Sequence, residues 1–224
     1  ELGDGVTELP AYLAVLRTNA GEAGALLQDM LISVTNFFRD ADAFHTLESH
    51  LPRLFNDKSV SDTIRAWVPA CATGEEAYSI AIMLCEYARR VPAPPRIQIF
   101  ATDLDEDAIR VGREGVYPEI IAADVSEDRL RRFFTREHHG YRVRREVREM
   151  VLFALHDVLR DSPFSRLDLI SCRNLLIYLN REAQQKIFNV LHFALRHEGL
   201  LFLGVSEAVD DGSGRGATRA ITTT

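Results

Sequence analysis

The sequence predicts an α/β protein built around a doubly wound, mostly parallel sheet. Short apolar segments typical of strands alternate along the chain with longer segments in which apolar residues have helical spacing. Proline or glycine closes several of these segments, as expected where a strand or helix ends. Hydrophobic residues make up 46% of the 224, enough to cover both faces of such a sheet.

Composition excludes several classes of protein. The formal net charge of −7 argues against a general nucleic-acid binder. No apolar run approaches the ~20 residues that span a bilayer, and no signal peptide opens the chain, so we expect no membrane insertion. The odd set of Cys71, Cys85 and Cys172 argues against a disulfide scaffold and indicates a cytoplasmic setting. The seven histidines lack metal-ligand spacing, so we expect no metal. The start at Glu1 suggests a fragment of a longer protein.

The first part of the chain, residues 1–55, is predicted to be a small helical domain. Apolar residues have helical spacing over residues 9–16, 23–31 and 41–55. A polar stretch, residues 56–62, then reads as a linker.

Residues 56–209 are predicted to form the sheet domain, followed by a flexible Gly/Thr-rich tail over 210–224. In the doubly wound order 3-2-1-4-5, the first and fourth strands are neighbours, which places Cys71 and Cys172 at the same edge. Ser126, Asn180 and Asp105 are expected to cap helices, while Gly115 and Gly199 are expected to end them. The main-sheet strands are expected at 64–68, 97–101, 150–155, 167–171 and 200–205, and the helices at 74–91, 105–114, 126–134 and 180–196.

The turn after the first strand indicates a ligand site. Gly74 permits close backbone approach where a helix begins, but neither the dinucleotide fingerprint nor the P-loop pattern is present. The adjacent acids Glu75 and Glu76 would repel a pyrophosphate and suit a cationic ligand such as S-adenosylmethionine. Alternatively, these acids only complement the helix dipole.

Polar residues also follow the other strands, where parallel sheets bind ligands. Asp103 is expected to accept from ribose hydroxyls, unless it simply caps the next helix as Asp105 does. Asp157 follows the third strand and could accept from an adenine amino group, and Arg173 follows the fourth. Together these clusters predict one adenosine-like ligand along the sheet edge.

Five motifs in order, SVTNFFRD, ACATGEEAYSIA, FATDLDEDAI, SCRNLLIYL and GLLFLGVSE, resemble the CheR-type methyltransferases of bacterial chemotaxis. The resemblance covers residues 9–207 and implies S-adenosylmethionine as cofactor, with S-adenosylhomocysteine as product. It implies methyl-ester formation on glutamates in the cytoplasmic helical region of chemoreceptors. It also implies a small antiparallel β insertion at about 133–153, used by some members for docking. Similar domains occur in larger esterase, methyltransferase and sensor-kinase fusions.

The resemblance also implies roles for individual residues. Ser33, Thr35 and Arg39 match the segment that closes over the cofactor, and Glu75 matches the acid that meets its amino group. The remaining positions match the ribose, adenine and transfer regions: Asp103 for ribose, Asp157 and Val158 for adenine, and Arg173 and Asn174 near the transfer site.

A glutamate nucleophile needs little chemical activation. Its pKa of ~4.3 leaves it ionised at neutral pH, so no general base is expected. Arg39 or Arg173 could orient its carboxylate, while Tyr178 lies near the substrate or is a core aromatic. A run of arginines is either a solvated face or a docking surface for an acidic receptor helix. It comprises Arg129, Arg131, Arg132, Arg136, Arg142, Arg144, Arg145 and Arg148.

Two other functions compete with this interpretation. A nicotinamide-dependent oxidoreductase is disfavoured by the missing glycine fingerprint and by the Glu75-Glu76 pair. A non-catalytic S-adenosylmethionine-binding domain that regulates a signalling protein remains open, because binding and catalytic residues overlap.

Overall fold

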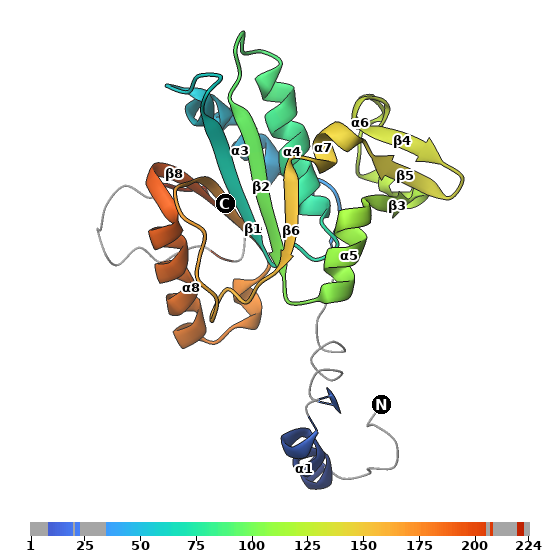
Figure 1. The fold of residues 1–224 in the computed structure, drawn as a ribbon, viewed down its shortest axis with the longest axis vertical. Helices are drawn as coiled ribbons and strands as arrows, with labels where there is room; N and C mark the ends of the chain where they lie inside the picture. Colours follow the sequence, from blue (N-terminus) through green and yellow to red (C-terminus); the bar gives the residue numbers. More distant parts are fainter. Residues whose placement is uncertain (1–8, 20, 23–34, 205–206, 208–218, 222–224) are drawn as a thin grey trace. The chain divides into compact units, whose positions relative to one another are not determined.

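The computed structural model describes residues 9–19, 21–22, 35–204, 207 and 219–221. The chain divides into two compact units, Glu1–Val34 and Thr35–Thr224. Figure 1 shows the chain coloured along the sequence. The sequence predicts a domain boundary after residue 55. The helix over 41–55 instead belongs to the second unit, because its apolar face packs into that unit's core.

In the first unit, helix α1 spans Leu9–Thr18, as its helical spacing predicts. The Tyr12 hydroxyl donates to Glu22 Oε1 at 2.9 Å. The helix expected over 23–31 lies outside the described residues. No helix in the described part of the chain has the length and apolar character needed to cross a membrane.

The second unit is built on a six-stranded sheet with the order β6-β2-β1-β7-β8-β9. All its strand pairs are parallel. Counted along the chain, the first five strands of this sheet are β1, β2, β6, β7 and β8. Their spatial order confirms the predicted order 3-2-1-4-5. The strands are β1 (Thr63–Pro69), β2 (Arg96–Asp103), β6 (Val151–Leu155), β7 (Leu167–Cys172), β8 (Leu195–Leu203) and β9 (Arg219–Ile221).

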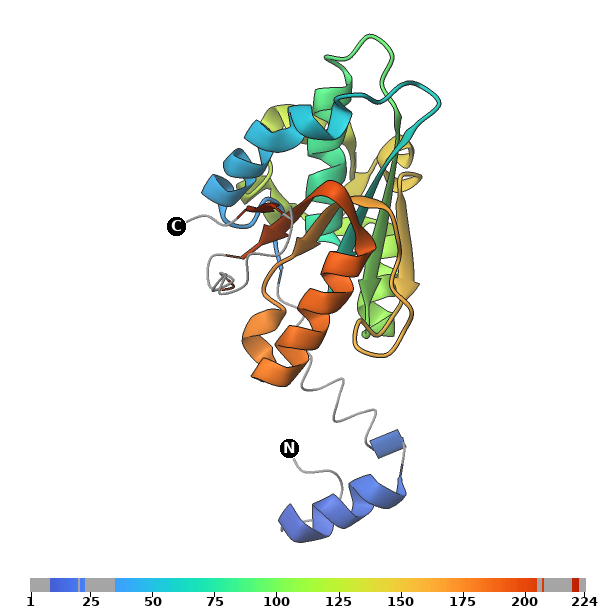
Figure 2. The ribbon, with the colours of Figure 1, turned by 90° about the vertical axis from the view of Figure 1, so that its left-hand side faces the viewer.

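Helices cover both faces of this sheet. One core cluster includes residues of α3, α4 and α5, and the other includes the inward residues of α8, which runs directly into β8 (Figure 2). These helices are α3 (Ala41–Phe55), α4 (Glu75–Ala88), α5 (Glu106–Glu114) and α8 (Arg181–Ala194). Short 3₁₀ helices, η1 (Glu119–Ala123) and η2 (Leu176–Tyr178), complete the connections.

The predicted helix caps are confirmed. Asp105 accepts from the backbone N–H groups of Asp107 and Ala108, both at 3.0 Å. The side chains of Ser126 and Asn180 likewise accept from the first turns of α6 (Glu127–Phe133) and α8. Gly115, with φ 62°, ends α5.

Two expectations about the end of the chain are wrong. Gly199 does not end a helix, because α8 stops at Ala194 and Gly199 lies within β8. Within the predicted flexible tail, the described residues Arg219–Ile221 pair with β8 as strand β9. The backbone of β8 supplies that pairing, so the local Gly/Thr-rich composition gives no sign of it.

A small antiparallel sheet forms the insertion. Its order is β3-β5-β4. The insertion is broader than the predicted 133–153, because β3 joins it at one end and β6 belongs to the main sheet at the other. Its elements are β3 (Val116–Pro118), β4 (Phe134–Glu137), β5 (Gly140–Val143) and α7 (Arg145–Arg148).

Candidate functional site

The carboxyl ends of the parallel strands meet along one edge of the main sheet. The strand register aligns these ends. Pro69 pairs with Thr102, Asp103 pairs with Leu155, and β7 pairs with β8 at Cys172. The structure thus gathers there the predicted site residues that directly follow or end these strands.

The turn after β1, residues 70–75, is held tightly in an unusual backbone conformation. Ala70 and Ala72 have φ of 52° and 46°, which is costly for residues other than glycine. Gly74 has φ 94°, and a Cβ on it would lie 2.8 Å from the Phe153 ring. The backbone N–H of Ala72 donates to Asp103 Oδ2 at 2.7 Å, which ties the turn to the end of β2. Contacts within the protein therefore hold this turn in place.

Glu75 carries the clearest chemical signal of a ligand. Its residue is only 9% exposed, and its carboxylate accepts from the Thr73 hydroxyl at 2.6 Å. Burial raises the pKa of this carboxyl above its ordinary value. Among the described side chains, no cation forms an ion pair with it. A buried carboxylate without a cationic partner fits the amino group of S-adenosylmethionine.

Glu76, by contrast, is already neutralised. Ser171 donates to its carboxylate at 2.7 Å, and Arg173 donates at 3.2 Å. The two adjacent acids therefore differ in their surroundings, since among the described residues Glu76 has a cationic partner and Glu75 has none.

Arg173 does not reach the protein surface. Its side chain is 0% exposed and also pairs with Asp40 at 2.6 Å and donates to the Arg39 carbonyl at 2.9 Å. Its guanidinium lies over the rings of Phe44 and Phe202. Because protein groups already bind this guanidinium, the prediction that Arg173 contacts a substrate carboxylate directly is disfavoured. They assign it instead to holding the Arg39 segment against α4.

Asp103 keeps acceptor capacity for a ligand. One carboxylate oxygen accepts from Ala72 N and the other from Asp105 N at 3.0 Å. Each oxygen retains a lone pair, so Asp103 can shape the turn and accept from ribose hydroxyls at the same time.

The residues predicted near adenine lie after β6. The Asp157 carboxylate accepts from Leu159 N at 2.9 Å and pairs with Arg160 at 3.5 Å, so it also stabilises its own turn. Val158 is half-buried against the second core cluster. Asn174 follows β7 with φ 59°, and its N–H donates to Glu207 at 2.8 Å.

The segment that carries Arg39 is anchored on both sides. Phe38 and Asp40 flank it with φ of 51° and 60°. The Phe38 N–H donates to Ser79 Oγ at 2.9 Å. Thr35 and Arg39 are half-buried, whereas the predicted contact of Ser33 lies outside the described residues.

Tyr178 is exposed, at 62%, within η2. The core-aromatic interpretation is therefore wrong. The ring can meet a macromolecular substrate.

The predicted arginine run is largely neutralised. Glu86 and Asp128 together bind Arg129, Arg131 and Arg132. Arg136, Arg142 and Arg145 each pair with a glutamate, and Arg144 donates to backbone carbonyls. This pattern agrees with the solvated-face alternative and removes much of the charge argument for docking.

Sequence reasoning missed residues whose roles depend on distant contacts. The Glu207 carboxylate accepts from the N–H groups of Asn174, Leu176 and Gly204. Its place in the GLLFLGVSE motif is a signal that could have identified it. Tyr117 donates to the Thr73 carbonyl at 2.7 Å, and nothing in its local sequence indicates that contact.

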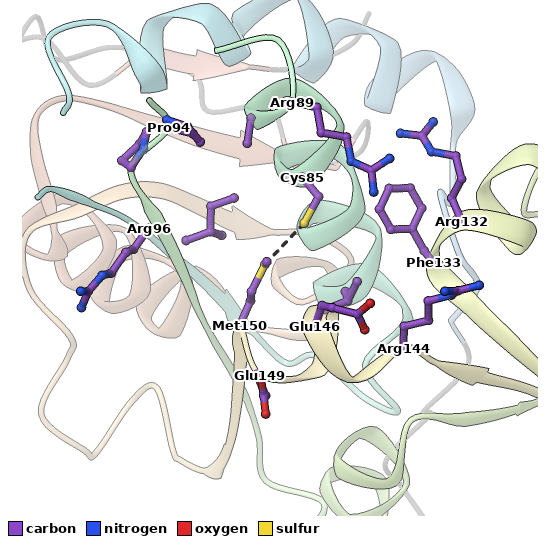
Figure 3. A pocket seen from close by; sticks show the side chains of 14 residues that line it. Cys85, Arg89, Pro94, Arg96, Arg132, Phe133, Arg144, Glu146, Glu149 and Met150 are labelled. Carbon is purple, nitrogen blue, oxygen red and sulfur yellow. Dashed lines mark hydrogen bonds between the residues drawn. The ribbon is translucent and has the colours of Figure 1, made fainter. Parts of the chain in front are cut away.

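A cavity of about 670 Å³ lies elsewhere, at the beginning of β2 rather than at its end (Figure 3). Cys85 and Met150 line it with their sulfur atoms in contact, 3.4 Å apart, and Arg89 lies beside Phe133. Because Arg96 begins β2 and Asp103 ends it, this cavity is separate from the candidate site. In the described part of the chain, no group of His, Cys, Asp and Glu side chains is placed to hold a metal ion.

Comparison with known proteins identifies relatives. The family model described as "CheR methyltransferase, SAM binding domain" matches residues 33–223. An uncharacterized 104.1 kDa protein of Rhodobacter capsulatus is 42% identical over 91% of this chain, which spans 22% of that protein's length. The chemotaxis protein methyltransferase of Escherichia coli K12 is 35% identical, with 91% of this chain and 71% of that protein covered. The structure of PKMT2 from Rickettsia typhi in complex with AdoHcy has a TM-score of 0.43 and 18% identity over 70% of this chain and 24% of that one.

Proposed function

This chain belongs to the CheR methyltransferase family, and we propose on that basis that it forms methyl esters on glutamate side chains of chemoreceptor-like proteins. The family is defined by a domain that binds S-adenosylmethionine, which is the cofactor. The proposed partner is the cytoplasmic helical region of a receptor, and the proposed location is the cytoplasm.

The observation that supports cofactor binding best is the buried carboxylate of Glu75, with which no cation pairs among the residues that the structure describes. We assign Glu75 to the amino group of the cofactor and Asp103 to its ribose hydroxyls, since both carboxylates keep free acceptor positions. Asp157 and Val158 are assigned to the adenine, and Thr35 and Asn174 to the remainder of the ligand. When bound, S-adenosylmethionine supplies an electrophilic methyl group attached to a sulfonium.

The residues of the chain itself supply position rather than acid–base chemistry. A substrate glutamate is ionised at neutral pH, so the site needs only to align it and to exclude water. Arg39 is assigned to orienting the substrate carboxylate, and the exposed Tyr178 to contact with the substrate protein. Arg173 acts indirectly, because it holds the Arg39 carbonyl and Asp40.

A methyl-transfer assay tests this function. The chain is incubated with S-adenosylmethionine labelled in its methyl group and with receptor cytoplasmic fragments. We expect label on the fragment that alkali releases as methanol, since esters hydrolyse in base. A fragment with its candidate glutamates changed to glutamine is the control and should remain unlabelled.

The same assay separates the proposed enzyme from a regulatory binding domain. Binding of S-adenosylhomocysteine without transfer to any receptor fragment would contradict the proposed activity and favour a non-catalytic role. The absence of both binding and transfer would contradict the cofactor site itself.

A further inference from the structure

The Tyr117 side chain connects the small antiparallel sheet to the candidate cofactor site. Tyr117 lies in β3 and is 2% exposed. Its hydroxyl donates to the Thr73 carbonyl at 2.7 Å, in the turn that leads to Gly74 and Glu75. Thus an element of the insertion holds the backbone of the turn after β1.

The Tyr117 ring also supports the segment that carries Arg39. Its centroid lies 4.9 Å from that of Phe37, with the two rings at 85°. Phe37 makes a second edge contact with Phe134 of β4, at 5.4 Å. Two residues before Arg39, the chain therefore packs against side chains from two strands of the small sheet.

A second connection ties the same two segments to α4. Ser79 Oγ accepts from Phe38 N at 2.9 Å and donates to the Glu75 carbonyl at 2.7 Å. Ser79 is completely buried. The Glu75 turn and the Arg39 segment therefore share one scaffold, of which Tyr117 is the part contributed by the small sheet.

We propose that Tyr117 is a positioning residue that holds the cofactor turn in its binding conformation and couples the small antiparallel sheet to the cofactor site. The inference rests on the proposed cofactor site but not on glutamate as the substrate. Tyr117 itself is not assigned a contact with the cofactor.

The physical reason lies in the backbone of the turn. Left-handed conformations at Ala70 and Ala72 persist only when surrounding contacts hold them. Without the hydroxyl of Tyr117, the free turn would sample other conformations, and ligand binding would have to order it again. Affinity falls in proportion to the fraction of molecules in the competent conformation.

Tyr78 provides a matched control for this contact. It is fully buried, and its hydroxyl also donates to a backbone carbonyl at 2.7 Å, that of Gly112 in α5. Its ring lies 6.1 Å from that of Tyr117. Tyr78→Phe therefore removes an equivalent buried hydrogen bond that does not hold the cofactor turn.

The first test measures S-adenosylhomocysteine binding to the full chain by calorimetry. We expect Tyr117→Phe to weaken binding about 3- to 10-fold, as for the loss of one net hydrogen bond. Tyr78→Phe should bind within about 2-fold of wild type, although both variants should unfold at lower temperature without ligand. Equal weakening by the two variants, or unchanged affinity of Tyr117→Phe, would overturn the assignment.

The second test needs no variant at Tyr117. Hydrogen exchange of the wild-type chain is compared with and without S-adenosylhomocysteine. We expect the ligand to slow exchange in peptides covering Val116–Pro118 and Gly140–Val143, and Phe37→Leu to reduce that protection. Normal ligand binding with unchanged exchange in these strands would overturn the coupling alone. Failure of the wild type to bind would overturn the cofactor site as well, whereas failure to methylate glutamate would affect neither measurement.

Discussion

At the scale of single residues, Glu75 shows a conflict between stability and binding. Burial raises the pKa of its carboxyl, so the unfolded chain loses this proton at a lower pH than the folded chain does. Folding is therefore weakened as the pH rises from the unfolded pKa, about 4.3, through the raised folded pKa, and the full loss is present above it. A ligand cation would remove that cost.

Glu75→Gln should therefore raise the melting temperature at neutral pH in the absence of ligand. The same change should weaken S-adenosylhomocysteine binding by about 1.5–3 kcal/mol, because a charge-assisted hydrogen bond is lost. Thermal unfolding and calorimetry measure the two effects. A variant that is less stable and binds normally would contradict the assignment of Glu75.

Substitutions of Asp103 and of Asp105 should affect stability and ligand affinity differently in the same experiments. Asp105→Ala removes the cap of α5 and should cost about 0.5–2 kcal/mol of stability with little change in affinity. Asp103→Ala should weaken ligand binding by about 1.5–3 kcal/mol. It should also destabilise the turn, because the Ala72 N–H loses the carboxylate that accepts its hydrogen bond. Similar affinities for the two variants would refute the ribose assignment.

At the scale of elements, a buried ionic network joins α4 to the segment before α3. Arg173, at the end of β7, bonds to both Glu76 and Asp40. The three residues belong to different parts of the chain, so the network holds together pieces that local sequence does not connect. Arg173 is enclosed, whereas the Asp40 side chain is 46% exposed.

Changes to this network should differ in severity according to burial. Glu76→Gln should cost about 1–3 kcal/mol, because the buried Arg173 guanidinium loses one of the two carboxylates that bind it. Burial raises the pKa of Glu76, so relief of that carboxylate's own desolvation offsets part of the loss. Asp40→Asn should cost clearly less, since water can reach that side of the pair. Urea unfolding measures both. Equal losses would show that Asp40 is as important as Glu76 to the network.

At the scale of the whole molecule, the two ends of the sheet differ in their accessibility to thiol reagents. Cys71 and Cys172 are 2% and 0% exposed near the strand ends, whereas Cys85 lines the cavity at the opposite end. The helical position of Cys85 indicated burial, but the cavity beside it depends on how α4, α6, α7 and the start of β2 pack together.

A maleimide should therefore modify Cys85 first in the native protein. The reaction should be slow and accelerate with pH, because burial raises the pKa of this thiol to about 11 and only the thiolate reacts. Cys71 and Cys172 should react only as the chain unfolds. Mass spectrometry of peptides from native and urea-treated protein measures this order. Native labelling of Cys71 or Cys172 ahead of Cys85 would contradict it.

We predicted the strand order, the capped helices and the edge at which the site lies from the sequence alone. These features follow from local periodicity, from residues such as Asp105 and Ser126 that act within one turn, and from the geometry of parallel sheets. The motifs also placed Gly74, Glu75 and Asp103 at that edge.

The pairing of charged side chains, by contrast, depends on how distant segments pack. Glu75 and Glu76 are adjacent acids in sequence, yet Arg173 binds Glu76 whereas no described cation pairs with Glu75. The contact of Tyr117 with the Thr73 carbonyl and the pairing of β9 with β8 likewise join residues far apart along the chain. Local patterns of polarity reflect burial and helix or strand periodicity. They carry no information about which partner lies across the fold, because packing of distant segments determines that choice.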